Sequence, residues 1–236
     1  MEEENVVRAA EMLQRKNLSA QVYDILEKRI LTGDIPPGAS LAEESAAEEF
    51  GISRSPVREA ISALEQIGLA ERGRGRDRRV VIPSAKFIAD TYDAWTILEA
   101  GRCYLSSLAA TAEDHDEIRR ALSGMEKAKR AHDLAIYSEL SRRFHHLLKC
   151  RCDNVQILSV FNNFEKYRQW LVALYHDDTD TSESTMKEHR EIAKRYIEKD
   201  LAGLTASIQR HIAGQKDRVL ASMTNRKGAA IERAAR

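Results

Sequence analysis

The segment at residues 50–83 constrains the fold most, because it combines a clearly bounded short helix with an arginine-rich hairpin. Gly51 can adopt the positive φ of a sharp turn between helices. Ser55 stands where an N-cap belongs, and Pro56 follows at the first helical position, where a missing N–H costs nothing. Gly68 ends the helix as a C-cap. A helix this short is unstable alone, so it must pack against neighbours and leave its outer face available.

The rest of this segment predicts a two-stranded hairpin with a basic tip. We expect the strands at residues 70–72 and 80–82, directly before Pro83. Five arginines lie within eight residues here, namely Arg72, Arg74, Arg76, Arg78 and Arg79. The formal net charge of the whole chain is zero, which counts against a whole-protein attraction for nucleic acid. The basic charge is local, and it lies beside the short helix.

Composition predicts that most of the chain is helical. The 236 residues include only 11 glycines and 4 prolines, and the 43% of residues that are hydrophobic suffice for a packed core. No apolar run approaches the roughly 20 residues that a membrane span requires. Residues 1–4 are acidic and no signal-peptide core follows, so we expect a cytoplasmic protein. Cys150 and Cys152 are interpreted as ordinary side chains rather than metal ligands, because no second cysteine pair accompanies them.

Helical periodicity and turn signals divide the chain into four parts. Residues 1–17 form a helical extension, and residues 18–83 contain three helices and the two-stranded wing of a winged helix-turn-helix. Residues 84–223 form an all-helical antiparallel bundle of six or seven helices, and residues 224–236 are a basic tail. We expect the bundle helices near residues 85–111, 115–131, 133–150, 154–176, 182–198 and 200–223, with Asp114 as the N-cap of the second.

The first domain matches a known family in order and in spacing. The matching residues are Ile30-Leu31-Thr32-Gly33, Pro37-Gly38, Gly51-Ile52-Ser53-Arg54-Ser55-Pro56-Val57-Arg58-Glu59-Ala60, Leu64-Glu65 and Gly68-Leu69. With them, residues 18–83 closely resemble the DNA-binding domain of the GntR superfamily of bacterial transcription regulators. The run from Ser53 to Ala60 is typical of the FadR subfamily, in which the second domain is an all-helical effector-binding bundle.

This resemblance implies that the helix at residues 56–67 enters the major groove of DNA. Arg54, Ser55 and Arg58 lie at its N-terminal end, where an arginine fork can bind both O6 and N7 of guanine. In the wing, Arg72, Arg74 and Arg76 are expected to bind phosphates or to enter the minor groove. The chain departs from many relatives at Glu44, where they carry an arginine and where a carboxylate would repel phosphates.

The second domain resembles the FCD domain of FadR-type regulators. The matches are Leu108-Ala109-Ala110, Phe144-His145-His146-Leu147-Leu148, Asp153-Asn154, Glu188-His189-Arg190-Glu191-Ile192 and the run from Asp200 to His211. In many such domains an aspartate and three histidines surround a divalent metal. His145, His189 and His211 fall on the histidine positions, whereas Ser141 replaces the aspartate. The resemblance implies a divalent transition metal, Zn or Ni, held by three imidazoles with one position open to solvent or a carboxylate.

An effector pocket would also need cationic anchors. Many relatives carry an arginine on the first helix of this domain and a glutamate one turn later, whereas this chain has Glu99 and then Arg102. Two interpretations remain open, a weak surface pair at i,i+3 spacing and a contact from Arg102 to an acidic effector. Arg168, which lies mid-helix near Tyr167 and Trp170, is the second candidate for binding the effector.

The resemblance therefore implies an effector-responsive transcription regulator, usually a repressor in this family. It would bind a pseudo-palindromic operator as a homodimer and sense a small organic acid. Two other classes stay open, namely a metal-dependent helical-bundle enzyme and a DNA-binding protein whose second domain only dimerises. We do not expect an enzyme, because no histidine follows a glutamate at the three-residue spacing of di-iron sites and no nucleophilic triad stands out.

Overall fold

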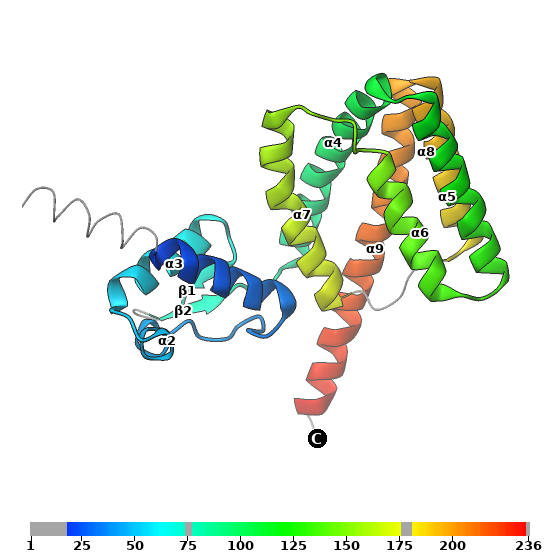
Figure 1. Ribbon diagram of the computed structural model, residues 1–236. Helices are drawn as coiled ribbons and strands as arrows, with labels where there is room; N and C mark the ends of the chain where they lie inside the picture. The colour runs from blue at the N-terminus through cyan, green and yellow to red at the C-terminus, as the bar shows by residue number, and fades with distance from the viewer. Residues whose placement is uncertain (1–17, 74–76, 176–180, 235–236) are drawn as a thin grey trace, which may run out of the picture. The chain divides into compact units, whose positions relative to one another are not determined.

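The computed structural model describes residues 18–73, 77–175 and 181–234 (Figure 1). The chain divides into two compact units, residues 1–84 and residues 85–236. The predicted helical extension at residues 1–17 lies outside the described residues. Among the described residues, no helix combines the length and the apolar character that crossing a membrane requires.

The first unit contains three helices and a two-stranded sheet, as the sequence predicts. Residues 18–32 form its first helix, and the other elements are α2 (Glu43–Phe50), α3 (Arg54–Gln66), β1 (Ala70–Arg72) and β2 (Arg78–Val80). The buried face of α3 includes Val57, Ile61 and Leu64, each at most 1% exposed. Each such side chain contributes about 1.5–3 kcal/mol on burial, and these contacts hold the short helix in place.

The start of α3 differs from the prediction. Ser53, not Ser55, is the N-cap, with φ −70° and ψ 158°, and Pro56 is the third helical residue. This position suits proline, because the first backbone N–H groups of a helix have no intrahelical acceptor. The predicted end is confirmed: Gly68 adopts φ +77°, and the Leu69 N–H donates to the Leu64 carbonyl over 2.9 Å.

Strand β2 of the wing forms backbone hydrogen bonds on both of its edges. β1 and β2 are antiparallel, with Ala70 opposite Val80 and Arg72 opposite Arg78. The Gly38 N–H donates to the Val80 carbonyl and the Val80 N–H donates to the Ala39 carbonyl, each over 2.9 Å. This second pairing explains why the second strand covers residues 78–80 instead of the predicted 80–82.

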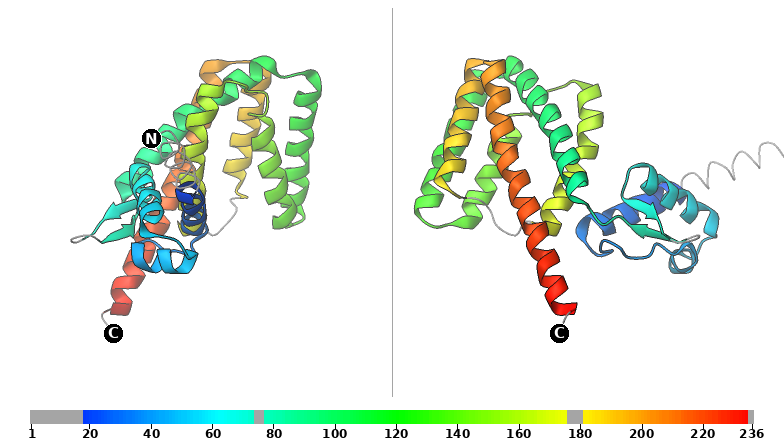
Figure 2. Two further views of the ribbon diagram at one scale, coloured as in Figure 1. Left: turned by 60° about the vertical axis from the view of Figure 1, so that its left-hand side comes forward. Right: turned by 180° about the vertical axis from the view of Figure 1, so that it is seen from behind.

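The second unit is an all-helical bundle, which confirms the predicted class. Its helices are α4 (Ala85–Ala109), α5 (Ala112–Arg130), α6 (Leu134–Leu147), α7 (Val155–Tyr175), α8 (Glu183–Glu198) and α9 (Leu201–Ala234). Figures 1 and 2 show α4 and α9 side by side through this unit, with α7 beside them and α5 beside α6. The core includes Tyr92, Ile118, Phe144, Phe161, Tyr196 and Ile212, all at most 1% exposed.

Two predicted boundaries in this unit are wrong. α9 continues to Ala234, beyond the expected end at residue 223, because the following segment is rich in alanine, lysine and arginine, which favour helix. The N-cap of α5 is Thr111, not Asp114. The two residues form a reciprocal capping box, in which each side chain accepts the backbone N–H of the other.

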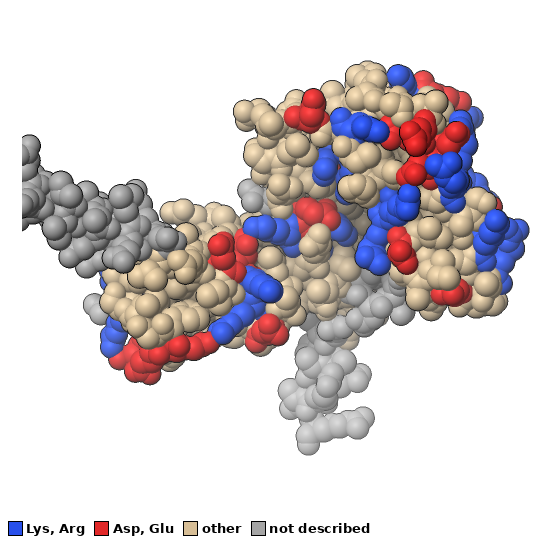
Figure 3. Space-filling view, viewed as in Figure 1, with Lys and Arg blue, Asp and Glu red and all other residues tan. Residues whose placement is uncertain are grey.

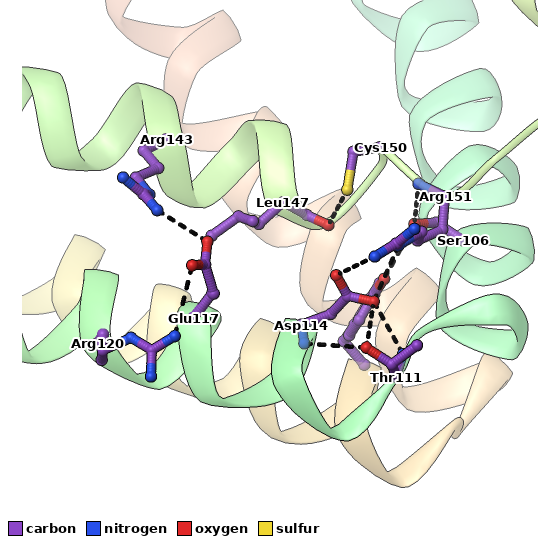
Figure 4. Close-up of polar contacts among 10 residues, drawn as sticks. Ser106, Thr111, Asp114, Glu117, Arg120, Arg143, Leu147, Cys150 and Arg151 are labelled. Atoms are coloured by element: carbon purple, nitrogen blue, oxygen red, sulfur yellow. Dashed lines mark hydrogen bonds and ion pairs between the residues drawn. The ribbon is translucent and has the colours of Figure 1, made fainter.

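Asp114 also anchors a polar network that joins several elements (Figure 4). Its carboxylate accepts two hydrogen bonds of 2.9 Å from the Arg151 guanidinium, on the connection between α6 and α7. The Arg151 N–H donates to Ser106 Oγ of α4 over 3.2 Å, and Ser106 bonds Tyr196 of α8 over 2.9 Å. The Arg151 guanidinium, followed by the Thr111 N–H, lowers the pKa of Asp114 from 3.8 to about 2.

We expect Asp114→Asn to lower the free energy of unfolding at pH 7 by about 1 kcal/mol, because the capping box and the ion pair are weakened. The contribution in the parent is present above pH 3.8 and is lost as the pH falls toward about 2, since the carboxylate becomes protonated. Urea unfolding at both ends of this range measures the difference. Glu113→Gln, at an exposed neighbour, is the control, and equal stability of Asp114→Asn and the parent at pH 7 would contradict the account.

Candidate functional site

Three helices bring the predicted histidines together. His145 comes from α6, His189 from α8 and His211 from α9, and their candidate ligand nitrogens all lie within 4.8 Å of one another. The ring centres are 5.1 Å apart for His145 and His189, 5.2 Å for His145 and His211, and 4.8 Å for His189 and His211. Three residues that span 66 positions of the sequence, from His145 to His211, thus form one cluster inside the bundle.

The environment of His145 favours its neutral form. Burial, followed by the charges of His189 and His211, holds the pKa of His145 well below its usual 6.5. His211 is oriented on both sides: its Nδ1 lies 2.9 Å from the Glu188 carboxylate, and its Nε2 lies 3.0 Å from the Gln215 amide nitrogen. Neutral imidazoles have lone pairs that can bind a late first-row transition metal.

Imidazole nitrogens are suitable ligands for Zn or Ni. The candidate ligand nitrogens lie up to 4.8 Å apart, which is farther than the ligands of a bound ion. Adjacent ligands on a tetrahedral ion with bonds of about 2.1 Å are about 3.4 Å apart, so the three rings would have to approach one another. Ser141 lies in the same wall as His145, as its place in the sequence predicts. Its neutral hydroxyl lacks the anionic oxygen of an aspartate.

The histidines line a cavity of about 520 Å³ inside the second unit, a size typical of small-molecule sites. Its walls come from α4, α6, α7, α8 and α9. The charged residues in these walls, apart from the histidines, are Glu99, Glu165, Arg142, Lys149, Arg168 and Arg218. Cationic side chains therefore outnumber carboxylates around the cavity.

Glu99 is buried in this wall and pairs with Lys149. Its side chain is 8% exposed, and the Lys149 ammonium lies 3.4 Å from its carboxylate. Burial raises the pKa of Glu99, and Lys149 offsets only part of this rise. The interpretation of Glu99 and Arg102 as a surface pair is therefore wrong for Glu99.

The two predicted effector anchors have different positions. Arg168 lines the cavity, its guanidinium bonds Glu165 at 2.6 Å, and its Cζ lies 4.8 Å from the centre of the Trp95 ring. Arg102 is not among the lining residues. It lies almost one turn beyond Glu99, where its Cζ is 4.5 Å from the centre of the ring of Phe161, on α7.

Of the predicted DNA-contacting residues, three lie on α3 and Arg72 lies in β1 of the wing. Arg54 and Arg58 are exposed, and Ser55 is half-buried. Arg54 pairs with Glu44 of α2, so the carboxylate that departs from the family pattern contacts an expected base reader.

The wing is joined to α3 through Glu65. The Glu65 carboxylate forms ion pairs with Arg78 at 3.0 Å and with Arg72 at 3.4 Å. Arg74 and Arg76 lie outside the described residues. On the face of the second unit drawn in Figure 3, acidic and basic side chains intermingle, unlike the arginine-rich sequence of the wing.

Family models match both units. Residues 18–80 match the model for bacterial regulatory proteins of the gntR family, and residues 90–214 match the FCD domain. The chain belongs to the GntR family. GntR-type regulators bind DNA operators, and FCD domains are effector-binding domains.

Relatives of this GntR protein are named as transcription regulators. It is 28% identical over 182 residues to the HTH-type transcriptional regulator YdhC of Bacillus subtilis (strain 168), which covers 76% of this chain and 81% of the relative. It is 28% identical over 152 residues to a probable D-xylose utilization operon transcriptional repressor of Paenarthrobacter nicotinovorans, covering 64% and 66%. The structure of E. coli McbR/YncC has the same fold, with a TM-score of 0.59, 18% identity and coverage of 88% and 98%.

Sequence reasoning missed several wall residues of this GntR protein. Lys149 and Gln215 follow His145 and His211 by four residues, and Glu165 precedes Arg168 by three. Helical spacing places such pairs on one face, so periodicity counted from the histidines and Arg168 could have found them. Arg218 follows His211 by seven residues and Gln215 by three on α9, so the same periodicity could have found it.

We expect Lys149→Met to destabilise the second unit, because it leaves the buried Glu99 carboxylate without its ion pair. The free energy of unfolding at pH 7 should fall by about 1–3 kcal/mol. The loss should shrink as the pH falls toward 4.5, the ordinary pKa of glutamate, because a protonated Glu99 needs no cation. Urea unfolding measures both effects, with the exposed Lys194→Met as the control. A Lys149→Met protein as stable as the control at pH 7 would show that the pair is unimportant.

Proposed function

We propose that this GntR regulator is an effector-responsive repressor of the FadR subfamily that binds a pseudo-palindromic operator as a homodimer. It would act in the cytoplasm, and its second unit would sense a small organic acid with the help of a bound metal. The observation that carries the proposal is the pairing of an exposed, arginine-bearing α3 in one unit with a histidine-lined cavity in the other. The names of the relatives, which are regulators and repressors, favour this role over an enzymatic one.

The DNA-reading part of the proposal rests on α3. Its apolar face is buried, so the opposite face with Arg58 is available for the major groove. Arg54, Ser55 and Arg58 would contact base edges and nearby phosphates from the N-terminal turns. Because Glu65 holds Arg72 and Arg78, the wing would approach the DNA backbone together with α3.

The sensing part rests on the charge of the cavity. Four cationic side chains and two carboxylates face it besides the histidines, and burial already raises the pKa of one of these carboxylates, Glu99. Such walls favour an anionic ligand of moderate size. His145, His189 and His211 would hold the metal, which would supply a Lewis-acidic position for the carboxylate of the effector.

We expect Arg58→Ala to weaken binding to the promoter region beside its own gene by roughly tenfold or more, because a base contact worth about 1–3 kcal/mol is lost. Fluorescence anisotropy with this duplex and with a shuffled duplex measures the change. Arg119→Ala, an exposed arginine of α5, is the matched control. An Arg58→Ala protein that binds the promoter as tightly as the parent would rule out this role for Arg58.

We expect Zn²⁺ to raise the melting temperature of the parent protein, because an ion that binds only the folded state stabilises it. His189→Ala should abolish this shift, whereas His146→Ala, which removes the neighbouring histidine of the cavity wall, should preserve it. A panel of carboxylic acids added to the zinc-loaded protein should give a further shift that Arg168→Gln reduces. Elemental analysis of the dialysed protein provides an independent count of metal. Equal zinc shifts in the parent and in His189→Ala would contradict the metal assignment.

A further inference from the structure

The side chain of Gln215 occupies an unusual position beside His211. Both residues lie on α9 one turn apart, both line the cavity, and the Gln215 amide nitrogen lies 3.0 Å from His211 Nε2. The family's aspartate position is occupied by Ser141, so the three histidines have no carboxylate from α6 beside them. Gln215 is thus a polar wall residue in hydrogen-bond contact with one of the three imidazoles.

Hydrogen bonding determines which nitrogen of His211 carries its proton. The Glu188 carboxylate can only accept, and it lies 2.9 Å from Nδ1, so Nδ1 carries a proton and donates to it. A metal can therefore bind His211 only through the lone pair of Nε2. The Gln215 amide nitrogen lies 3.0 Å from Nε2 and is placed to donate to that lone pair.

The same lone pair is the one available to a metal. Because Nδ1 donates to Glu188, His211 can bind an ion only through Nε2. The Gln215 NH₂ group must then move away from Nε2 to expose its lone pair. Rotation of the amide by half a turn exchanges its nitrogen and oxygen, which presents a carbonyl oxygen to the same region. The observed separation of 3.0 Å between the Gln215 amide nitrogen and His211 Nε2 is close to the distance of about 3.4 Å between adjacent ligands of a tetrahedral ion.

We propose that Gln215 is the oxygen ligand of the metal site in this chain and replaces the aspartate that Ser141 lacks. This inference rests on the metal part of the proposed function. The resulting set of three imidazoles and one amide has no charge, so the ion keeps its full double positive charge. An anionic effector, bound as a fifth ligand, is then attracted more strongly than in a site with an aspartate, and metal and effector should each raise the affinity for the other.

Zinc titration of the full-length protein against a chromophoric chelator tests the assignment. Gln215→Ala should weaken zinc binding by about tenfold or more, as is typical for residues that support a metal site. Gln215→Glu should tighten it by at least about tenfold, because an anionic oxygen replaces a neutral one. Gln169→Ala removes another glutamine from the same cavity wall and should leave the zinc affinity unchanged.

A double substitution distinguishes a metal-ligand role of Gln215 from a general structural role. In a Ser141→Asp protein, which regains a carboxylate on α6, Gln215→Ala should weaken zinc binding by a smaller factor than it does in the parent. Co²⁺ absorption of the parent and of Gln215→Ala should differ in intensity, because the two proteins supply different donors. The variants' urea unfolding curves without metal check that each is folded.

Unchanged or tighter zinc binding in Gln215→Ala would overturn the inference, since Gln215 would then only compete with the ion for His211. If the parent takes up no zinc, this inference and the metal part of the proposed function both fail. The DNA-binding part is decided separately by the Arg58→Ala titration, so the two failures are distinguishable.

Discussion

Charge buried in a helical bundle has to be paired, and the cavity of the second unit depends on this constraint. Desolvation of an isolated carboxylate or guanidinium costs several kcal/mol, which only a close partner can offset. Glu165 shows the balance: burial pushes its pKa upward, but the hydrogen bond and charge of Arg168 outweigh burial, so the pKa is lowered. At Glu99 the more distant Lys149 does not suffice, and the pKa is raised.

These pairs make the cavity suitable for sensing. Each cation of a pair is already oriented by its carboxylate, so a ligand that exchanges for the carboxylate meets a preorganised donor. The same logic applies to Glu188, which fixes the orientation of His211. An effector can control DNA binding only if it binds one arrangement of the protein better than another, and exchange of buried ion-pair partners is a physical means to create this difference.

Sequence reasoning was most successful where local rules decide the structure. The C-cap at Gly68, the wing and the three histidines follow from short patterns and from the family motif, and the structure brings the histidines together. Sequence reasoning failed where packing decides between two residues of the same type. Ser53 and Ser55 are equivalent as capping residues in sequence, and only the structure shows that Ser53 has the extended backbone of the N-cap while Ser55 is already helical. Arg102 and Arg168 are equivalent cations in sequence, and only the packing shows that Arg168 lines the cavity whereas Arg102 lies over the Phe161 ring.

The central claim is that occupancy of the cavity controls operator affinity. The most direct measurement is an anisotropy titration of the promoter duplex with the zinc-loaded protein, with and without the carboxylic acid that most raises its melting temperature. We predict that the acid changes the dissociation constant for the promoter by at least about fivefold, the usual lower end of such coupling, and leaves a shuffled duplex unaffected. An unchanged dissociation constant at saturating acid would contradict the claim.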